Sequence, residues 1–170
     1  MVGKKQRKPR LFVGSSTESL GIAYAIQDNL EDDAEVTVWQ QNVFDLTASA
    51  LESLVRVLSK ADFGVFVFKP SDVLRLRRKK YTAVRDNVVF EMGLFIGKLG
   101  RRRTFYVVPK DSDGLRIPTD LLGIRPGHYD AKRQDKNFQA ALGPFCNKLR
   151  TAMRKVRPIT RPGRARRSTS

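Results

Sequence analysis

The sequence predicts an α/β fold, in which a parallel sheet of about five strands is wrapped by helices on both faces. Short apolar runs alternate with segments in which apolar residues recur at helical spacing, and the links between them are short. Residues 63–68 are almost entirely apolar, which is typical of a central parallel strand that is covered on both sides. Alternation and a buried central strand together favour a doubly wound sheet over a helical bundle or a β-sandwich.

The individual elements follow from the same patterns. The expected strands cover residues 10–14, 36–39, 63–68, 104–108 and 127–130. The expected helices cover residues 20–30, 48–60, 86–99 and 138–153, and either Thr17 or Ser19 can cap the first of them. Residues 74–82 carry so many basic side chains that we expect a basic loop there. Most of the chain is therefore assigned to one repeating strand and helix pattern.

The net charge of +16 is distributed unevenly along the chain. Residues 1–10 hold five basic residues and residues 148–170 hold nine, with no acidic residue in either segment. Residues 11–147 therefore carry 19 basic and 17 acidic residues, a net charge of only +2. We expect a basic N-terminal tail at 1–9, one domain at 10–156 and a basic disordered tail at 157–170.

The tails contain no aromatic residues that could stack on bases. They are expected either to aid solubility or to bind polyanions loosely, and not to read a nucleic-acid sequence. No apolar run approaches the roughly 20 residues that span a bilayer, and the run at 11–13 is too short for a signal peptide. We expect a cytoplasmic protein that does not act on a membrane.

Metal and thiol chemistry find little support in the sequence. Cys146 is the single cysteine, and His128 is the single histidine and follows Pro126 and Gly127 in an expected turn. Neither a Cys/His metal site nor a Cys–His nucleophile pair can be built from them. We expect no metal and no cofactor.

Glu91 is the most informative residue because it lies inside an otherwise strongly apolar helical segment. At roughly 100° per residue, Val88, Met92 and Phe95 fall on one core-facing stripe, and Glu91 lies at its shoulder. Asn87 precedes it by one turn on the same flank. A buried carboxylate costs several kcal/mol unless it has a partner or a role. Glu91 is therefore either an active-site carboxylate or half of an ordinary salt bridge at the helix edge.

Ligands of doubly wound sheets bind beyond the carboxyl ends of the strands. The loops expected there are 15–18, 40–46 and 69–82, with Glu91 facing the crevice between them. Neither a dinucleotide fingerprint nor a P-loop is present. The candidate binding residues in this crevice are Ser15, Ser16, Trp39, Lys79, Lys80, Arg85 and Asn87.

Each candidate also has a structural reading. The two serines favour phosphate near a helix N-terminus, or they simply form a capped turn. Trp39 could stack on a ring of the ligand or pack in the core. Lys79, Lys80 and Arg85 could meet phosphates, or they belong to a mobile basic loop. Gly93 and Gly97 would let another helix of the chain, or another subunit, approach closely.

A lone catalytic carboxylate restricts the chemistry. No Ser-His-Asp triad can be assembled, and no second carboxylate shares the flank of Glu91. Cleavage of a glycosidic bond normally needs two carboxyl groups, one of which protonates the leaving group. Nicotinamide leaves NAD as a neutral molecule, so one carboxylate that stabilises the ribosyl cation can suffice.

Four segments carry a family resemblance: RLFVGSS at 10–16, ADFGVFVF at 61–68, RDNVVFEMGLFIGKLGR at 85–101 and IPTDLLGI at 117–124. Over residues 9–130 the chain resembles bacterial TIR-like domains regarded as nucleotide-binding proteins, which act as effectors in cyclic-nucleotide anti-phage systems. The resemblance implies a flavodoxin-like TIR fold and NAD glycohydrolase activity, with Glu91 as the catalytic residue. It also implies head-to-tail assembly in which the loop 40–46 completes a neighbour's site.

The family's sensor domain is not found within these 170 residues, so we expect a stand-alone effector, a domain excised from a larger chain, or the partner of a separate sensor of a nucleotide second messenger. We expect an NAD glycohydrolase with NAD as substrate, Glu91 as the catalytic residue and Ser15, Ser16, Trp39, Arg85 and Asn87 as substrate-binding residues. One alternative is a non-catalytic TIR-like module that binds a nucleotide or acts as a scaffold. Another is an enzyme resembling nucleoside deoxyribosyltransferases, which would transfer sugar between bases.

Overall fold

The computed structural model describes residues 7–39, 49–70, 72–76, 79–112, 114–118, 121 and 123–159. Five parallel strands form the main sheet in the spatial order β2-β1-β3-β6-β8. They are β1 (Arg10–Gly14), β2 (Glu35–Val38), β3 (Phe63–Val67), β6 (Thr104–Pro109) and β8 (Gly127–Tyr129). This strand order is that of flavodoxin-like sheets, so the predicted fold class is confirmed.

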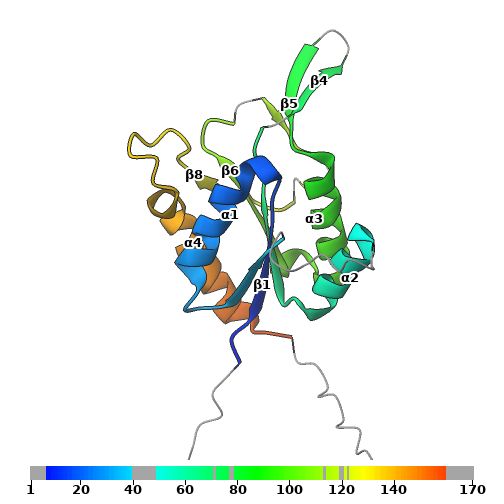
Figure 1. The fold of residues 1–170 in the computed structure, drawn as a ribbon, viewed down its shortest axis with the longest axis vertical. Helices are drawn as coiled ribbons and strands as arrows, with labels where there is room; N and C mark the ends of the chain where they lie inside the picture. Colours follow the sequence, from blue (N-terminus) through cyan, green and yellow to red (C-terminus); the bar gives the residue numbers. More distant parts are fainter. Residues whose placement is uncertain are drawn as a thin grey trace, which may run out of the picture.

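Helices cover both faces of the sheet (Figure 1). The helices α1 (Leu20–Leu30) and α4 (Phe138–Val156) pack on one face, and α2 (Ala50–Lys60) and α3 (Asp86–Leu99) pack on the other. Two short 3-10 turns, η1 (Thr17–Ser19) and η2 (Arg101–Arg103), precede α1 and follow α3.

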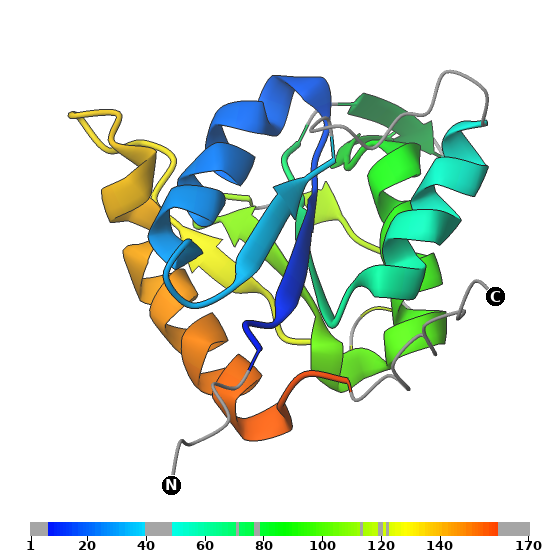
Figure 2. The same ribbon diagram turned by 60° about the horizontal axis from the view of Figure 1, so that its bottom comes forward.

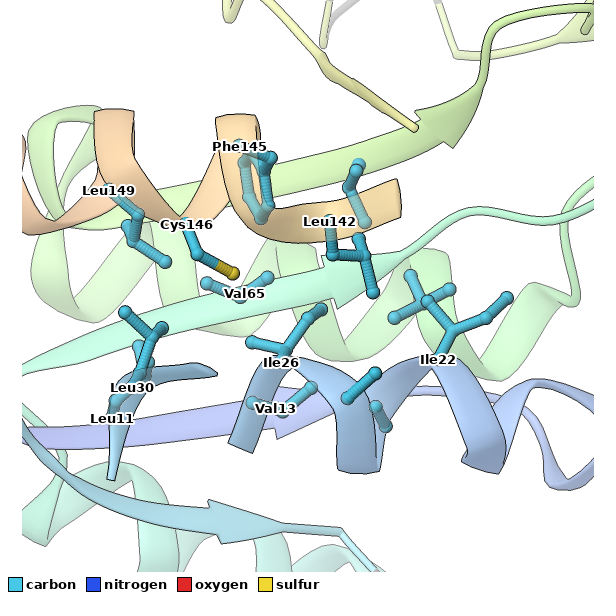
Figure 3. Packing of buried hydrophobic residues seen from close by; sticks show 14 of the residues in the cluster. Leu11, Val13, Ile22, Ile26, Leu30, Val65, Leu142, Phe145, Cys146 and Leu149 are labelled. Atoms are coloured by element: carbon cyan, nitrogen blue, oxygen red, sulfur yellow. The ribbon is translucent and has the colours of Figure 1, made fainter. Parts of the chain in front are cut away.

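The alternation of side chains along β1 joins the two halves of the core. Leu11 and Val13 point toward α1 and α4 (Figure 3), where they meet an apolar cluster that includes Ile26. Phe12 points the other way and stacks on Phe95 of α3, with the ring centroids 4.9 Å apart. Since burial of each such side chain contributes about 1.5–3 kcal/mol, this packing fixes α3 firmly against the sheet.

A β-hairpin replaces the basic loop that we expected at 74–82, so that expectation is wrong. Strand β4 (Asp72–Leu76) pairs antiparallel with β5 (Lys79–Ala83), and β7 (Leu115–Arg116) pairs parallel with β5 to form a second sheet of three strands. The hairpin projects from the body beyond the start of α3 (Figure 1). Backbone pairing satisfies the peptide groups whatever the charge of the side chains, which is why a basic segment can still form strands.

Asp62 holds both ends of the domain together at the opposite end of the sheet. Its fully buried carboxylate accepts two hydrogen bonds from Arg7, at 2.9 and 3.2 Å, and one from each of the backbone N–H groups of Arg10 and Ile159. Burial alone would raise the pKa of Asp62, but these donors hold it below its ordinary value. Arg7 and Ile159, which lie within the predicted tails, therefore contact the domain, whereas residues 1–6 and 160–170 lie outside the described residues.

The structure also bears on what we expected of two glycines, the single cysteine and the single histidine. Gly93 and Gly97 are exposed, and a Cβ atom at either would have nothing within 4 Å among the described residues, so no helix of the chain packs there. Cys146 is buried, and burial raises its pKa to about 12, while His128 is exposed. The described part of the chain holds no cluster of three metal-ligating side chains, and none of its helices is long and apolar enough to span a bilayer.

Candidate active site

A polar pocket of about 330 Å³ lies beyond the carboxyl end of β1, next to the start of α3. It is lined by Ser15, Ser16, Thr17, Glu18, Trp39, Arg85, Asn87, Val88 and Glu91. The chain leaves the neighbouring strands β1 and β3 toward helices on opposite faces of the sheet, so this is the point where the strand order reverses. The structure brings Glu91 together with the five residues that we expected to bind substrate: Ser15, Ser16, Trp39, Arg85 and Asn87.

Glu91 occupies the second turn of α3 and reaches toward the end of β1. Its helix is anchored by Val88 and Met92, which are buried in the core. A Cβ atom placed on Gly14 would lie 2.6 Å from the ring of Phe66 and 3.2 Å from Oε2 of Glu91. Only glycine at the last position of β1 lets the carboxylate and the ring approach the strand so closely.

The carboxylate of Glu91 is buried, and the described residues give it no hydrogen-bond or ion-pair partner. The residue is 7% exposed, and its Oε2 atom accepts no hydrogen bond from the described residues. Burial raises the pKa of Glu91 to about 7. Glu91 forms no ion pair with any described residue, so within this part of the chain it is not half of a salt bridge at the helix edge. A carboxyl group tuned toward neutral pH in a cleft is a typical feature of a catalytic site.

The two serines lie between β1 and the first helical turns. Ser15 is buried and its Oγ atom has no hydrogen-bond partner among the described residues, while the hydroxyl of Ser16 donates to Oγ of Ser19 at 3.1 Å. Ser19 occupies the N-cap position of α1, as one of the two expected residues, but its side chain accepts no cap hydrogen bond. The unused hydroxyl of Ser15 at the positive end of a helix is suited to bind an anionic group.

Arg85 and Glu18 form an ion pair at the edge of the pocket. The Nη2 atom of Arg85 lies 2.7 Å from Oε1 of Glu18, and both side chains are about half exposed. The backbone N–H of Glu18, the hydroxyl of Ser16 and the Arg85 guanidinium together lower the pKa of Glu18. Sequence reasoning found no second carboxylate for this site because it considered only the helical flank of Glu91. The signal was nevertheless present, since Glu18 lies in the loop 15–18 that we expected beside the crevice.

Trp39 packs in the core, which is one of the two roles expected from the sequence, and it also lines the pocket. It directly follows β2, its backbone N–H donates to the carbonyl of Val13, and its ring meets Phe12 edge-on with centroids 5.8 Å apart. Residues 40–46 lie outside the described residues, and Lys79 and Lys80 are placed in β5 by their backbone only.

A family model for the TIR domain of CAP12/Pycsar effector proteins matches residues 10–131. The Pycsar effector protein PaPycTIR of Pseudomonas aeruginosa is 39% identical over 159 residues, which cover 93% of this chain and 51% of that protein. The CD-NTase-associated protein 12 of Lachnospiraceae bacterium (strain RUG226) is 33% identical and is covered over 46% of its length, against 88% of this chain. The chain thus spans about half the length of these relatives.

The solved structures that resemble the chain support the fold alone. A flavodiiron core of Flv1 from Synechocystis superposes with a TM-score of 0.53 at 14% identity, over 90% of this chain and 38% of that one. A diflavin flavoprotein A3 from Nostoc superposes with a TM-score of 0.51 at 12% identity, over 89% of this chain and 99% of that one. The family model and the curated relatives together show that the chain belongs to the family of TIR domains of CAP12/Pycsar effector proteins.

Proposed function

We propose that this domain cleaves NAD to nicotinamide and ADP-ribose, linear when water adds to the ribose or cyclic when the substrate's own adenine does, as an effector of anti-phage defence that is switched on by assembly. The observation that carries the proposal is the buried, unpaired carboxylate of Glu91 in a polar pocket at the switch point of the sheet. We include the effector role in the proposal because the relative PaPycTIR is named a Pycsar effector protein.

The chemistry requires a charge rather than an acid. In NAD the nicotinamide nitrogen is cationic, and when the bond to the ribose breaks, both electrons go to that nitrogen and nicotinamide leaves neutral. A positive charge then develops on the ribose, and the ionised carboxylate of Glu91 stabilises it before water adds to the sugar carbon. Because the carboxylate is desolvated, this attraction is stronger than it would be in water.

The other residues of the pocket are suited to hold the substrate. Arg85 and the hydroxyl groups at the start of η1 would bind the diphosphate, which is an anion placed at the N-terminal end of helical turns. Asn87 lies one turn before Glu91 and would orient the ribose or the carboxylate, and Trp39 offers a ring for stacking. The volume of about 330 Å³ suits one end of a dinucleotide.

Assembly is supported by an uncovered stripe on α3. Phe90 is 56% exposed, and Gly93 and Gly97 follow it at helical spacing with open space before them. A neighbouring subunit could therefore approach this helix closely. Because the relatives are about twice as long as this chain, the trigger would come from a further segment or from a separate sensor of a nucleotide second messenger.

The test is release of nicotinamide from NAD by concentrated or artificially clustered protein. We expect turnover by the wild type and none by Glu91→Gln, which keeps the size of the side chain and removes its charge. The matched control is Glu18→Gln, the same chemical change in the same pocket, and we expect it to retain turnover. Equal activity of the wild type and Glu91→Gln would exclude the mechanism.

The polar lining of the pocket also suits a nucleotide that is bound without being cleaved. That alternative predicts nucleotide binding or filament formation that survives Glu91→Gln, with no turnover under any condition. Transfer of deoxyribose between bases without NAD cleavage would instead indicate an enzyme like nucleoside deoxyribosyltransferases.

A further inference from the structure

The basic segments of the chain converge on one end of the domain. Of these basic segments the structure describes residues 7–10 and 148–159, and the start of β1 and the end of α4 lie at the same end of the sheet (Figure 2). The helices run antiparallel to the strands, so α2, α3 and α4 also end there (Figure 1). The fold thus collects charges that are far apart in the sequence at the end opposite to Glu91.

Five cations lie on η2 and on the ends of α3 and α4, and we call this set the basic pole. They are Lys98, Arg101, Arg102, Lys155 and Arg157. All five are exposed, and within the described part of the chain none of their side chains makes an ion pair or a hydrogen bond. The segments 98–110 and 150–159, which supply them, contain no acidic residue.

Arg103 joins the two parts of the basic pole. Its guanidinium donates to the carbonyl oxygens of Arg157, at 2.8 Å, and of Val156 and Asp62, both at 3.3 Å. These bonds tie η2 to the last residue positions of α4 and to the start of β3. The cations of η2 and of α4 are consequently held beside one another on a rigid surface.

The acidic residues at this end do not neutralise the basic pole. Asp33 contacts Arg150 and Arg154, and Glu35 contacts Arg10, on the side of the domain formed by α1 and β2. Asp62 is fully buried and is satisfied by its own donors. These ion pairs engage Arg150 and Arg154 of α4 and Arg10 of β1. Arg157 lines the same pocket as Asp33, but neither it nor the other four cations of the basic pole forms an ion pair within the described part of the chain.

Arg157 adds an observation that helix electrostatics does not explain. Lys98 and Lys155 lie in the last turns of their helices, where the negative end of the helix dipole stabilises a cation. The dipole alone therefore accounts for these two charges. Arg157 instead has a φ of 60°, a conformation that costs a non-glycine residue of the order of 1 kcal/mol and that glycine adopts freely. The strained backbone at Arg157 therefore places a charged side chain where glycine would be less strained.

We propose that the basic pole binds the phosphate backbone of double-stranded nucleic acid without sequence preference. Arginine predominates in it, and the planar guanidinium pairs with phosphate oxygens in two-pronged fashion. The pole contains no aromatic side chain for base stacking, which favours a duplex over single strands. The large apolar side chains exposed among the described residues, such as Leu51 and Phe90, belong to other surfaces, so nothing at the pole inserts into a bilayer.

Binding at this end leaves the Glu91 pocket open. Several domains on one nucleic acid would be brought to a high local concentration, which favours assembly. The proposal does not depend on NAD cleavage, and Glu91→Gln is expected to bind nucleic acid as the wild type does.

The experiment is fluorescence anisotropy of a labelled DNA duplex of about 20 base pairs titrated with the full chain. If about four phosphates are neutralised, the affinity falls on the order of 100-fold between about 50 mM and 200 mM salt. The test variant combines Arg101→Gln, Arg102→Gln and Arg157→Gly, the last of which also relieves the backbone strain. We expect it to lose about 10-fold in affinity or more.

The control variant combines Lys69→Gln, Lys110→Gln and Lys136→Gln, which removes the same charge from exposed positions that follow β3, follow β6 and precede α4, at the opposite end of the sheet. It is expected to bind almost as the wild type does. Equal losses in the two variants, no loss in either, or binding to phosphatidylserine vesicles without binding to DNA would overturn the proposal. The single change Arg102→Glu at an exposed position provides the same comparison if the triple variant does not fold.

Discussion

The unpaired burial of Glu91 predicts that the charge of this residue destabilises the folded domain. The folded-state pKa is about 7 against an ordinary value of 4.5, and the cause is desolvation. The folded state therefore holds a proton that the unfolded state loses between these two values, so stability falls as the pH rises from about 4.5 to 7 and beyond. In Glu91→Gln this position cannot ionise, so we expect the variant not to lose stability in this way as the pH rises.

The size of the effect follows from the two pKa values. Between pH 5 and pH 8 the wild type should lose about 2.5 kcal/mol of unfolding free energy relative to Glu91→Gln. For a domain of this size that corresponds to about 5–10 °C in melting temperature. Urea unfolding of both proteins at the two pH values measures it. A difference between the two proteins that does not change with pH would refute the claim that the carboxylate is buried and unpaired.

Three further predictions concern neighbouring features. Gly14→Ala places a Cβ atom 2.6 Å from a phenylalanine ring of β3 and should cost about 1–3 kcal/mol in urea unfolding, whereas Gly93→Ala, with open space before it, should be neutral or stabilising. Glu18→Gln removes the carboxylate that pairs with Arg85 and repels substrate phosphates, and it should lower the KM for NAD by up to about fivefold without changing kcat; an unchanged KM would show that the Glu18 charge does not oppose substrate binding. Asp62→Asn should cost about 1–3 kcal/mol at neutral pH, and because the pKa of Asp62 is depressed, the difference from the wild type should shrink as the pH falls; a constant difference would argue against the charge as the cause.

The sequence predicted the main sheet and its helices because their signals are local. The predicted spans of β1 and α3 agree with the structure, since an apolar run and a helical stripe each contain their own evidence. The β4–β5 hairpin was missed because we gave its charges more weight than the alternation of leucine and arginine in its sequence. Its pairing with β7 joins segments that are far apart along the chain and has no local signal.

The sequence could predict those parts of the candidate site that lie in loops at the carboxyl end of the sheet, because the topology of a parallel sheet brings these loops together. A carboxylate in an apolar helix drew attention to Glu91, and the parallel sheet placed Ser15 and Trp39 near it. The shoulder position suggested partial exposure, but Glu91 is 7% exposed because Gly14 leaves room for its carboxylate against the strand. The pairing of Arg85 with Glu18, 67 residues away in sequence, could be found only in the structure.

The most direct test of the central claim is the pH dependence of kcat/KM for NAD cleavage by the assembled wild-type protein. This quantity reports the ionisation of essential groups in the free enzyme, and only the ionised form of Glu91 can stabilise a ribosyl cation. With a pKa of about 7, kcat/KM should rise about tenfold from pH 6 to pH 8. A flat profile, or one that falls over this range, would contradict the role assigned to Glu91.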